Sequence, residues 1–278
     1  MPARTESAGA PAGGIPRPPL IREVLLVVGL FLVYKFGRRL ALGHTTAAFH
    51  NADRVWGLER AVHLPGEDAV QSLLLRDETV VHLANVYYAT VHFPATVLFL
   101  VWLYLRRPAH YLWARRVLAA VTSVALILPF VFPLAPPRML TSTGLEDTGR
   151  LYGPSVYGPP TTDHLSNQFA AMPSLHFGWA LMVAVGLIAA TRSRWRWLWL
   201  LHPLITLTVI VGTANHYWLD SVAATVMFLL AFAFIRGPDA PPSGGPGLRS
   251  RPRFGFRPRF RFRPGPAPDD GPLLPATR

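Results

Sequence analysis

Six long apolar segments, separated by polar and arginine-rich links, limit what this chain can fold into. They cover residues 23–42, 78–104, 117–135, 172–191, 197–214 and 217–236. A membrane-spanning helix needs about 20 mainly apolar residues, and each segment is close to that length. Lipid admits only helices or closed barrels, and the alternation of a membrane barrel is absent. The sequence therefore predicts an all-α fold, a six-transmembrane-helix bundle that ends in a tight hairpin around His216.

Arginines fill every second link between the apolar segments and so indicate the orientation. They are Arg106, Arg107, Arg115 and Arg116, then Arg192, Arg194 and Arg196, and finally Arg236. The positive-inside rule places these links and both termini on the cytoplasmic side. The connections 43–77 and 136–171 and the turn near residue 215 then face outward. The 43–77 connection is long enough for an extra interfacial helix.

The two ends of the chain differ from the middle. Residues 1–20 and 237–278 are rich in Pro and Gly and cannot bury a core, so we expect disordered tails around a membrane domain of residues 21–236. Much of the net charge of +12 lies in the arginine–phenylalanine run 251–263. Such a run can stack on single-stranded nucleic acid or lie on anionic lipid, and the adjacent membrane domain favours anionic lipid over nucleic acid.

Two polar stretches, 171–176 and 215–220, lie at the edges of apolar segments. A charged group at the bilayer centre costs about 2.5–3.5 kcal/mol, so such groups suggest a function. His216 and Asp220 are four residues apart and share one face of a helix. There the carboxylate can fix the imidazole tautomer and raise the basicity of the other nitrogen, as in a catalytic triad. The alternative is a polar pair that only joins two helices.

The second stretch opens the fourth apolar segment with Pro173, Ser174 and His176. Proline fits the first turn of a helix, where the free N–H groups and the Ser174 hydroxyl form an anion site. His176 lies one turn further, where it can protonate a leaving group. An ordinary capped helix with a buried histidine is the alternative.

Arg138 follows two prolines at the outward end of the third segment. Arginine binds tetrahedral oxyanions through its planar fork, although arginines at helix ends also snorkel. With the two polar stretches it gives a cation, a helix N-terminus, two histidines and a carboxylate at one membrane level. This set predicts phosphoryl transfer that uses no metal and no cofactor. The chain has no cysteine, which excludes thiolate chemistry and disulfides.

These motifs resemble signatures of the type 2 phosphatidic acid phosphatase superfamily. Residues 173–176 resemble its P-S-x-H motif, and residues 216–220 resemble its H-x-x-x-D motif. The strings 170–176 and 215–217 look most similar to its inositol phosphorylceramide synthase-like (inositolphosphotransferase) branch, common in actinobacteria, and 136–139 resembles that branch's first signature. The resemblance covers about residues 50–236.

The resemblance implies a cell-membrane lipid-phosphate phosphatase or phosphotransferase with its active site facing outward. His216 would form a phosphohistidine, oriented by Asp220, while His176 would protonate the departing alcohol. The phosphate oxygens would be held by Arg138, Ser174 and Asn215. Water or a second alcohol would then take up the phosphoryl group.

The chain departs from the superfamily pattern at two cations. The lysine expected seven residues before the signature arginine is Val131, and the arginine expected six residues before the histidine is Ile210. The branch named above tends to lack both. Arg150 in the outward loop is a candidate substitute for one of them.

A second polar face lies in the second apolar segment. Asn85, Tyr88 and His92 recur at spacings of three and four, so they share one helical face. They are candidates to line a headgroup pocket for a polyol or sugar, with hydrogen bonds between helices as the alternative. The loop 140–170 is a candidate lid or an ordinary solvated loop.

Two other functions remain open at this stage. His176, His216 and Asp220 together are also a two-histidine, one-carboxylate metal set. A catalytically inactive lipid-binding or transport protein would keep the same pocket without turnover. The sequence does not predict the oligomeric state or the acceptor alcohol.

Overall fold

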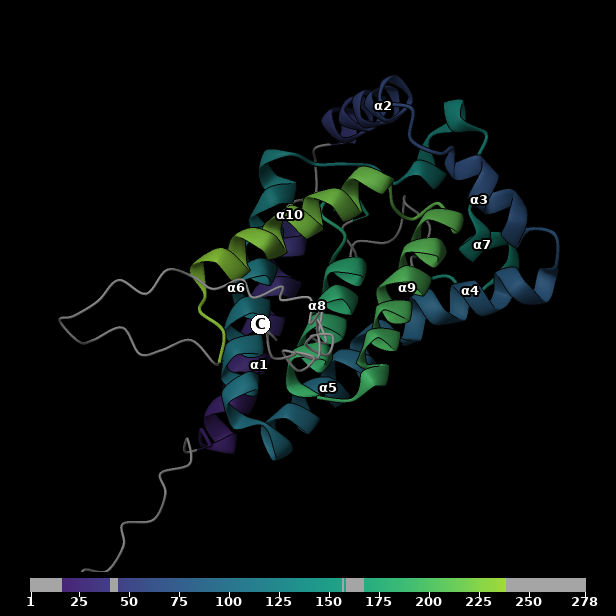
Figure 1. Cartoon of the computed structure of the whole chain (residues 1–278). Helices are drawn as coiled ribbons and strands as arrows, with labels where there is room; N and C mark the ends of the chain where they lie inside the picture. The colour runs from purple at the N-terminus through teal and green to yellow at the C-terminus, as the bar shows by residue number, and fades with distance from the viewer. Residues whose placement is uncertain (1–16, 41–44, 157, 159–167, 239–278) are drawn as a thin grey trace, which may run out of the picture. The chain divides into compact units, whose positions relative to one another are not determined.

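A computed structural model describes residues 17–40, 45–156, 158 and 168–238 of the chain (Figure 1). Its α-helices are α1 (Leu20–Leu40), α2 (Thr45–Ala61), α3 (Glu67–Leu74), α4 (Glu78–Thr90), α5 (His92–Arg106), α6 (Pro108–Val131), α7 (Thr148–Tyr152), α8 (Leu175–Ala190), α9 (Leu201–Gly212) and α10 (Trp218–Phe234). Three 3₁₀ segments are η1 (Pro137–Met139), η2 (Thr141–Thr143) and η3 (Arg194–Leu200). The described ranges contain no β-strand, which confirms the predicted all-α class.

Two or three stretches of the described chain have the length and composition of a membrane span. Among the described residues, α6 and the continuous η3–α9 stretch are long and apolar enough to cross a membrane, and α4 with α5 is a third span if the two count as one. The helices α8 and α10 are apolar but have only 16 and 17 residues. The helix α1 carries five charged residues and is not among these spans. A bundle of six transmembrane helices therefore stays a prediction.

The second predicted span is broken in the middle. The axes of α4 and α5 differ by 48°, and the break falls at Val91. Pro94 explains it, because proline lacks an N–H group and its ring clashes with the carbonyl four residues earlier, here that of Thr90.

The main core lies between α5, α6, α8 and α10, which pack against one another along the bundle (Figure 1). Its buried residues include Phe99, Leu103, Val117, Met182 and Phe228. Gly178 of α8 is required for this packing, since a Cβ there would lie 2.8 Å from the Phe228 ring. The close approach of α8 and α10 begins only two residues after His176.

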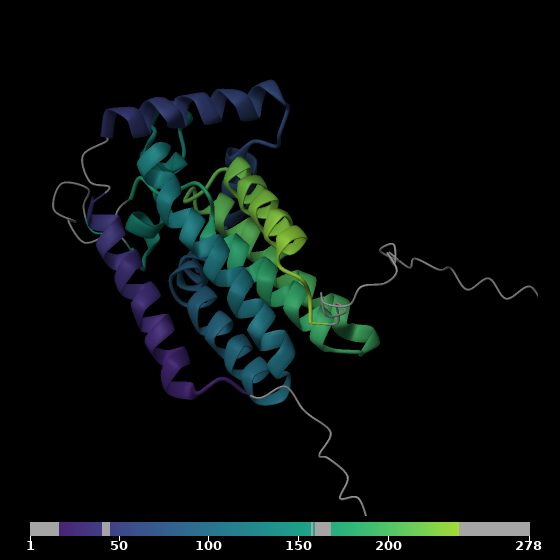
Figure 2. The same ribbon diagram turned by 90° about the vertical axis from the view of Figure 1, so that its left-hand side faces the viewer.

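The helix α2 lies across one end of the bundle instead of running along it (Figure 2). It corresponds to the interfacial helix expected in the 43–77 connection, which also contains α3. The Asn51 side chain donates to the Pro133 carbonyl at 2.9 Å, and the Ala48 carbonyl accepts from Ala135 N at 3.2 Å. Both bonds tie α2 to the chain that follows α6.

The N-terminal helix α1 is attached to α6 through charged and polar groups. Arg115 and Tyr111 both donate to the buried Glu23 carboxylate. Arg17 donates to the Leu105 carbonyl at 2.8 Å, so contact with the bundle begins within the predicted tail of residues 1–20. The rest of that tail, residues 1–16, lies outside the described residues.

The helices described above all belong to one compact unit of the chain. The described part of the chain ends at residue 238. The predicted disorder of 237–278 and its predicted binding to anionic lipid therefore fall almost entirely outside the described residues.

Candidate active site

The chain after α6 and the chain before α8 run side by side. Leu134 N donates to the Phe169 carbonyl at 2.8 Å, and Ala171 N donates to the Leu134 carbonyl at 3.2 Å. This short parallel bridge brings the segment that carries Arg138 next to the segment that leads into Ser174 and His176. Two of the three predicted motifs are thus joined by backbone hydrogen bonds.

The third motif joins them through the turn between α9 and α10. Arg138 N donates to the Ala214 carbonyl at 3.0 Å, and Ser174 N donates to the Asp220 carbonyl at 3.1 Å. The fully buried Tyr217 donates its hydroxyl to the Ala135 carbonyl at 3.0 Å. The structure therefore brings all three motifs together at one end of the bundle.

The predicted hairpin around His216 is confirmed, because α9 ends at Gly212 and α10 begins at Trp218. Within the buried turn, Ala214 has φ of 52°, a left-handed conformation that is uncommon for a residue with a Cβ. Asn215 N and His216 N both donate to the Ile210 carbonyl at 3.1 Å. These bonds hold the strained turn and fix the position of the histidine.

His216 has a defined tautomer. Its Nδ1 lies 2.8 Å from the Ala171 carbonyl oxygen and 3.1 Å from Asp220 Oδ2. A carbonyl only accepts hydrogen bonds, so Nδ1 carries the proton and Nε2 carries the lone pair.

The pairing of His216 with Asp220 was predicted, but the helix on which both were expected to lie was not found. His216 precedes α10, and Asp220 lies in the first turn, where its Oδ2 also accepts from Tyr217 N at 3.0 Å.

Ser174 and His176 lie at the start of α8. The helix begins at Leu175, so Pro173 precedes it instead of occupying its first turn as expected. Ser174 is the N-cap, is fully buried, and accepts from Phe177 N at 3.4 Å through its hydroxyl oxygen. The His176 ring centroid lies 5.7 Å from that of His216.

Two aromatic residues of the second apolar segment contact His176. Tyr88 stacks on it with centroids 4.4 Å apart, and His92 lies beside it at 3.9 Å. His92, His176 and His216 therefore form a row of three imidazoles. Tyr88 and His92 approach His176 together, as expected for residues four apart on one helical face. His92 was predicted to line a headgroup pocket, and the structure places it against His176.

Arg138 contacts the side chains of Asn215, Gln168 and Asp147. Its Nη1 donates to Asn215 Oδ1 at 2.7 Å, its Nη2 donates to Gln168 Oε1 at 3.4 Å, and its Nε lies 3.5 Å from Asp147 Oδ2. The Asn215 amide in turn donates to Thr213 Oγ1 at 2.8 Å. Because Asn215 directly precedes His216, the guanidinium is oriented next to the candidate nucleophile.

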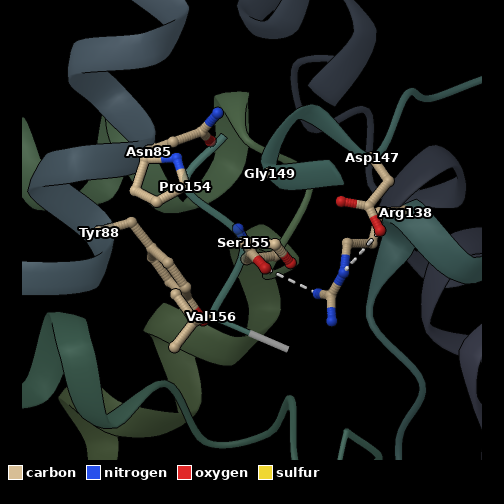
Figure 3. Close-up of a pocket in the computed structure, with 9 residues that line it drawn as sticks. Asn85, Tyr88, Arg138, Asp147, Gly149, Pro154, Ser155 and Val156 are labelled. Atoms are coloured by element: carbon tan, nitrogen blue, oxygen red, sulfur yellow. Dashed lines mark hydrogen bonds and ion pairs between the residues drawn. The ribbon is translucent and has the colours of Figure 1, made fainter. Parts of the chain in front are cut away.

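A small pocket with an empty volume of about 220 Å³, part of it open to solvent, lies beside these groups (Figure 3). Its lining residues are Asn85, Tyr88, Arg138, Asp147, Gly149, Pro154, Ser155, Val156 and Asn215. Two of the three predicted headgroup residues, Asn85 and Tyr88, are among them. Since Tyr88 also stacks on His176, the pocket adjoins the row of histidines.

Asn85 uses its hydrogen-bonding groups to hold the outer loop. Its amide donates to the carbonyls of Thr148 and Gly153 at 2.8 and 3.2 Å, and its oxygen accepts from the Thr148 hydroxyl at 2.9 Å. Gln71 of α3 holds the same loop through Glu146 N and O at 2.8 and 3.0 Å. Neither Gln71 nor Asp147 was predicted from the sequence, because no local pattern distinguishes them from other polar surface residues.

The two positions that depart from the superfamily pattern carry apolar side chains in different settings. Val131 is 79% exposed at the end of α6, and Ile210 is buried in α9. Arg150 lies exposed on α7 and is not among the pocket residues. Within the described ranges, no group of three or more His, Asp or Glu side chains is arranged to hold a metal ion.

Comparison with known proteins agrees with this geometry. Residues 53–234 match the PAP2 superfamily, and the chain belongs to that superfamily. Over 171 residues it is 27% identical to the inositol phosphorylceramide synthase catalytic subunit aur1 of Schizosaccharomyces pombe (strain 972 / ATCC 24843). The aligned region covers 55% of this chain and 39% of that relative, so the chain spans well under half of its length. No solved structure matches the chain.

The superfamily and the branch predicted from the motifs are thereby confirmed. Family membership and the apolar helices together indicate a multi-pass membrane protein of the lipid phosphatase and phosphotransferase class.

Proposed function

We propose that the chain transfers phosphoryl groups from a membrane lipid phosphate through a phosphohistidine at His216. The observation that carries the proposal is the double contact of His216 Nδ1 with the Ala171 carbonyl and the buried Asp220 carboxylate. This contact leaves Nε2 with a lone pair and stabilises positive charge on the ring, which are the two requirements of a nucleophilic histidine.

In the first step, His216 Nε2 attacks phosphorus and the bond from phosphorus to the leaving oxygen breaks. His176 donates a proton to that oxygen, so the alcohol departs neutral. Arg138 neutralises the phosphate oxygens, with Asn215 orienting its guanidinium and the Ser174 hydroxyl as a further donor. In the second step, water or a second alcohol attacks the phosphohistidine and releases His216.

The identity of the acceptor depends on the pocket beside the histidines. The relative named as an inositol phosphorylceramide synthase subunit supports an alcohol acceptor, and therefore a phosphotransferase. Tyr88 and His92 lie against His176, where an acceptor hydroxyl has to give up its proton. We assign the headgroup pocket to this side, with Asn85 holding its outer wall.

We further propose that both termini are cytoplasmic and that the site faces outward. The arginine-rich links support this orientation through the positive-inside rule. A cysteine introduced at exposed Ser142, in the loop after Arg138, should react with a membrane-impermeant maleimide in intact cells. Protection of that cysteine until the cells are lysed would reverse the orientation.

The central experiment traps the phosphoenzyme. Purified protein is incubated with labelled phosphatidate, polyprenyl diphosphate or phosphatidylinositol, and label is sought on protein, as free phosphate and on a second alcohol. We expect acid-labile, alkali-stable label on the wild type and on the control His110→Gln, and none on His216→Gln. If no substrate is turned over and no label is trapped, the proposal fails.

Two rival functions give different results in the same assay. A catalytically inactive lipid-binding or transport protein, which the apolar residues at positions 131 and 210 favour, would bind lipid equally well in the wild type and in His216→Gln without turnover. A metal enzyme would lose its activity with chelator. The proposed mechanism predicts inhibition by vanadate and no effect of chelator.

A further inference from the structure

Two buried glutamates lie behind the His216–Asp220 pair and have no part in the proposed mechanism. Glu59 is near the end of α2 and Glu67 is the first residue of α3, and the side chains of both are fully buried. Fully buried glutamates are uncommon unless they are paired, because removing a charge from water is costly. Their presence therefore needs a specific explanation.

Each of the two carboxyl groups has one oxygen with a partner and one without. Glu59 Oε1 accepts from Leu219 N, in the first turn of α10, at 2.8 Å. Glu67 Oε2 forms an ion pair with Arg60. The other two oxygens, Glu59 Oε2 and Glu67 Oε1, are buried without a hydrogen-bond donor. A hydrogen bond with the Glu67 side chain is one cause of the raised pKa of Glu59, so the two carboxyl groups act on each other directly.

We propose that Glu59 and Glu67 share one proton and act as a positioning clamp for the first turn of α10. A proton on Glu59 turns Oε2 into a donor toward Glu67, while Oε1 continues to accept from Leu219 N. Leu219 directly precedes Asp220, so the clamp fixes the carboxylate that orients His216. A second bond from the same turn, Trp218 Nε1 to the Pro65 carbonyl at 2.8 Å, supports the attachment.

The surrounding charges favour a neutral Glu59. Glu67 and Asp220 are the carboxylates that act on it, Arg60 compensates Glu67, and Asp220 accepts a hydrogen bond from His216 Nδ1. Burial, the hydrogen bond with Glu67 and repulsion by both carboxylates raise the pKa of Glu59 from 4.5 to about 9. At neutral pH one proton is therefore retained.

The raised pKa makes the contribution of Glu59 to folding stability depend on pH. The folded state binds the proton more tightly than the unfolded state, where the pKa of Glu59 is near 4.5. The stability contribution of Glu59 is therefore fully present below pH 4.5 and is lost as the pH rises toward about 9. Above that pH, Glu59 is ionised beside Glu67 and Asp220, and the clamp loses its proton.

Glu59→Gln is the decisive variant. Its amide donates to Glu67 and accepts from Leu219 N but cannot ionise, so it imitates protonated Glu59. We expect its melting temperature, followed by tryptophan fluorescence, to exceed that of the wild type by a margin that grows by about 5 °C between pH 6 and 9. Asp68→Asn, which changes an exposed carboxylate next to Glu67, should follow the wild type. Equal pH dependence of wild type and Glu59→Gln would overturn the shared proton.

The expected effect of the clamp on kcat rests on the proposed function, and a comparison of Glu59→Leu with Glu59→Gln tests it. Glu59→Leu removes both bonds, and we expect a loss of about tenfold or more in kcat at pH 7 with KM little changed, because misplacing a catalytic group slows chemistry. Glu59→Gln should restore kcat and extend activity to higher pH. Wild-type kcat in Glu59→Leu, or no recovery in Glu59→Gln, would refute the positioning role.

The two proposals can fail separately. The melting experiment requires no turnover, so it tests the clamp even if Glu59→Leu does not fold or no substrate is found. Absence of a phosphoenzyme in the wild type would refute the proposed function and leave the pH-dependent difference in melting intact.

Discussion

Two buried charged clusters lie near opposite ends of α6 and differ in how completely they are paired. Near its start, both oxygens of Glu23 are occupied, one by Arg115 and one by the Tyr111 hydroxyl at 2.6 Å. Beyond its end, Asp220 uses only Oδ2 to bind His216 Nδ1, and its Oδ1 has no hydrogen-bond partner. Both clusters bury charge, but only the second keeps reactive groups available.

The difference indicates what each cluster does. A fully paired buried carboxylate has no remaining capacity for a ligand, and the Glu23 cluster therefore attaches α1 to α6. A cluster with unpaired buried groups carries an energetic cost that packing elsewhere has to offset, and such sites are commonly functional. The variants below test this assignment, in order of decreasing expected effect on turnover.

Asp220→Asn should have the largest effect among them. The amide removes the negative charge that stabilises protonated His216 and weakens the preference for the Nδ1 proton. We expect kcat to fall by about 10⁴-fold, as for the corresponding change in a catalytic triad. Steady-state kinetics with the best lipid substrate measures it, and a loss below tenfold would show that the pair is structural like the Glu23 cluster.

Arg138→Lys should reduce kcat/KM by about 10- to 100-fold. Lysine keeps the charge but cannot present a planar fork to phosphate or hold Asn215 and Gln168 together. The matched control is Arg150→Lys on the exposed face of α7. If the Arg150 variant loses as much activity as the Arg138 variant, Arg150 is the substitute for the missing superfamily cations.

Asn85→Ala should have a smaller effect, mainly on KM. It removes three hydrogen bonds that hold the 148–153 segment over the pocket, each worth about 1 kcal/mol. We expect KM for the acceptor to rise by about threefold to tenfold while the rate of phosphoenzyme formation changes little. A large loss of phosphoenzyme formation would place Asn85 in the first chemical step instead.

Arg115→Ala should leave turnover within about twofold of the wild type and lower stability. Removing one partner of a buried ion pair leaves Glu23 uncompensated, at a cost of about 3 kcal/mol. That cost corresponds to a decrease of about 6–12 °C in melting temperature for a domain of this size. Arg116→Ala, an exposed neighbour, is the control. Loss of turnover without loss of stability would invalidate the comparison of the two clusters.

Much of the fold and the central part of the site could be predicted from the sequence. The apolar segments indicated helices, because a segment that spans lipid must satisfy its backbone hydrogen bonds internally, which a helix does through local contacts. The hairpin at His216, the link of His216 with Asp220 and the N-cap at Ser174 are local arrangements, so spacing alone indicated them. The helix around the His216–Asp220 pair was nevertheless expected where the structure has a turn.

Other features depended on residues far apart in the chain. Asn85 bonds Thr148, 63 residues away, and this contact makes it an anchor for the loop instead of a simple pocket residue. His92 contacts His176 through the packing of α5 against α8. Glu59 reaches Leu219 across 160 residues. A repeating pattern in the sequence does not predict such contacts, since they arise from the packing of separate helices.

The sequence by itself determined that the chain is helical and apolar, that it belongs with the type 2 phosphatidic acid phosphatases, and which short motifs carry polar groups. The helical class and the polar motifs follow from local spacing and composition, and the superfamily follows from the resemblance of those motifs to its signatures. The tertiary structure alone decided that Nδ1 of His216 carries the proton, that three histidines form a row, and that a pair of buried glutamates lies behind Asp220. Each of these depends on which hydrogen-bond partners the packed helices bring within about 3 Å, and that is a property of the assembled bundle.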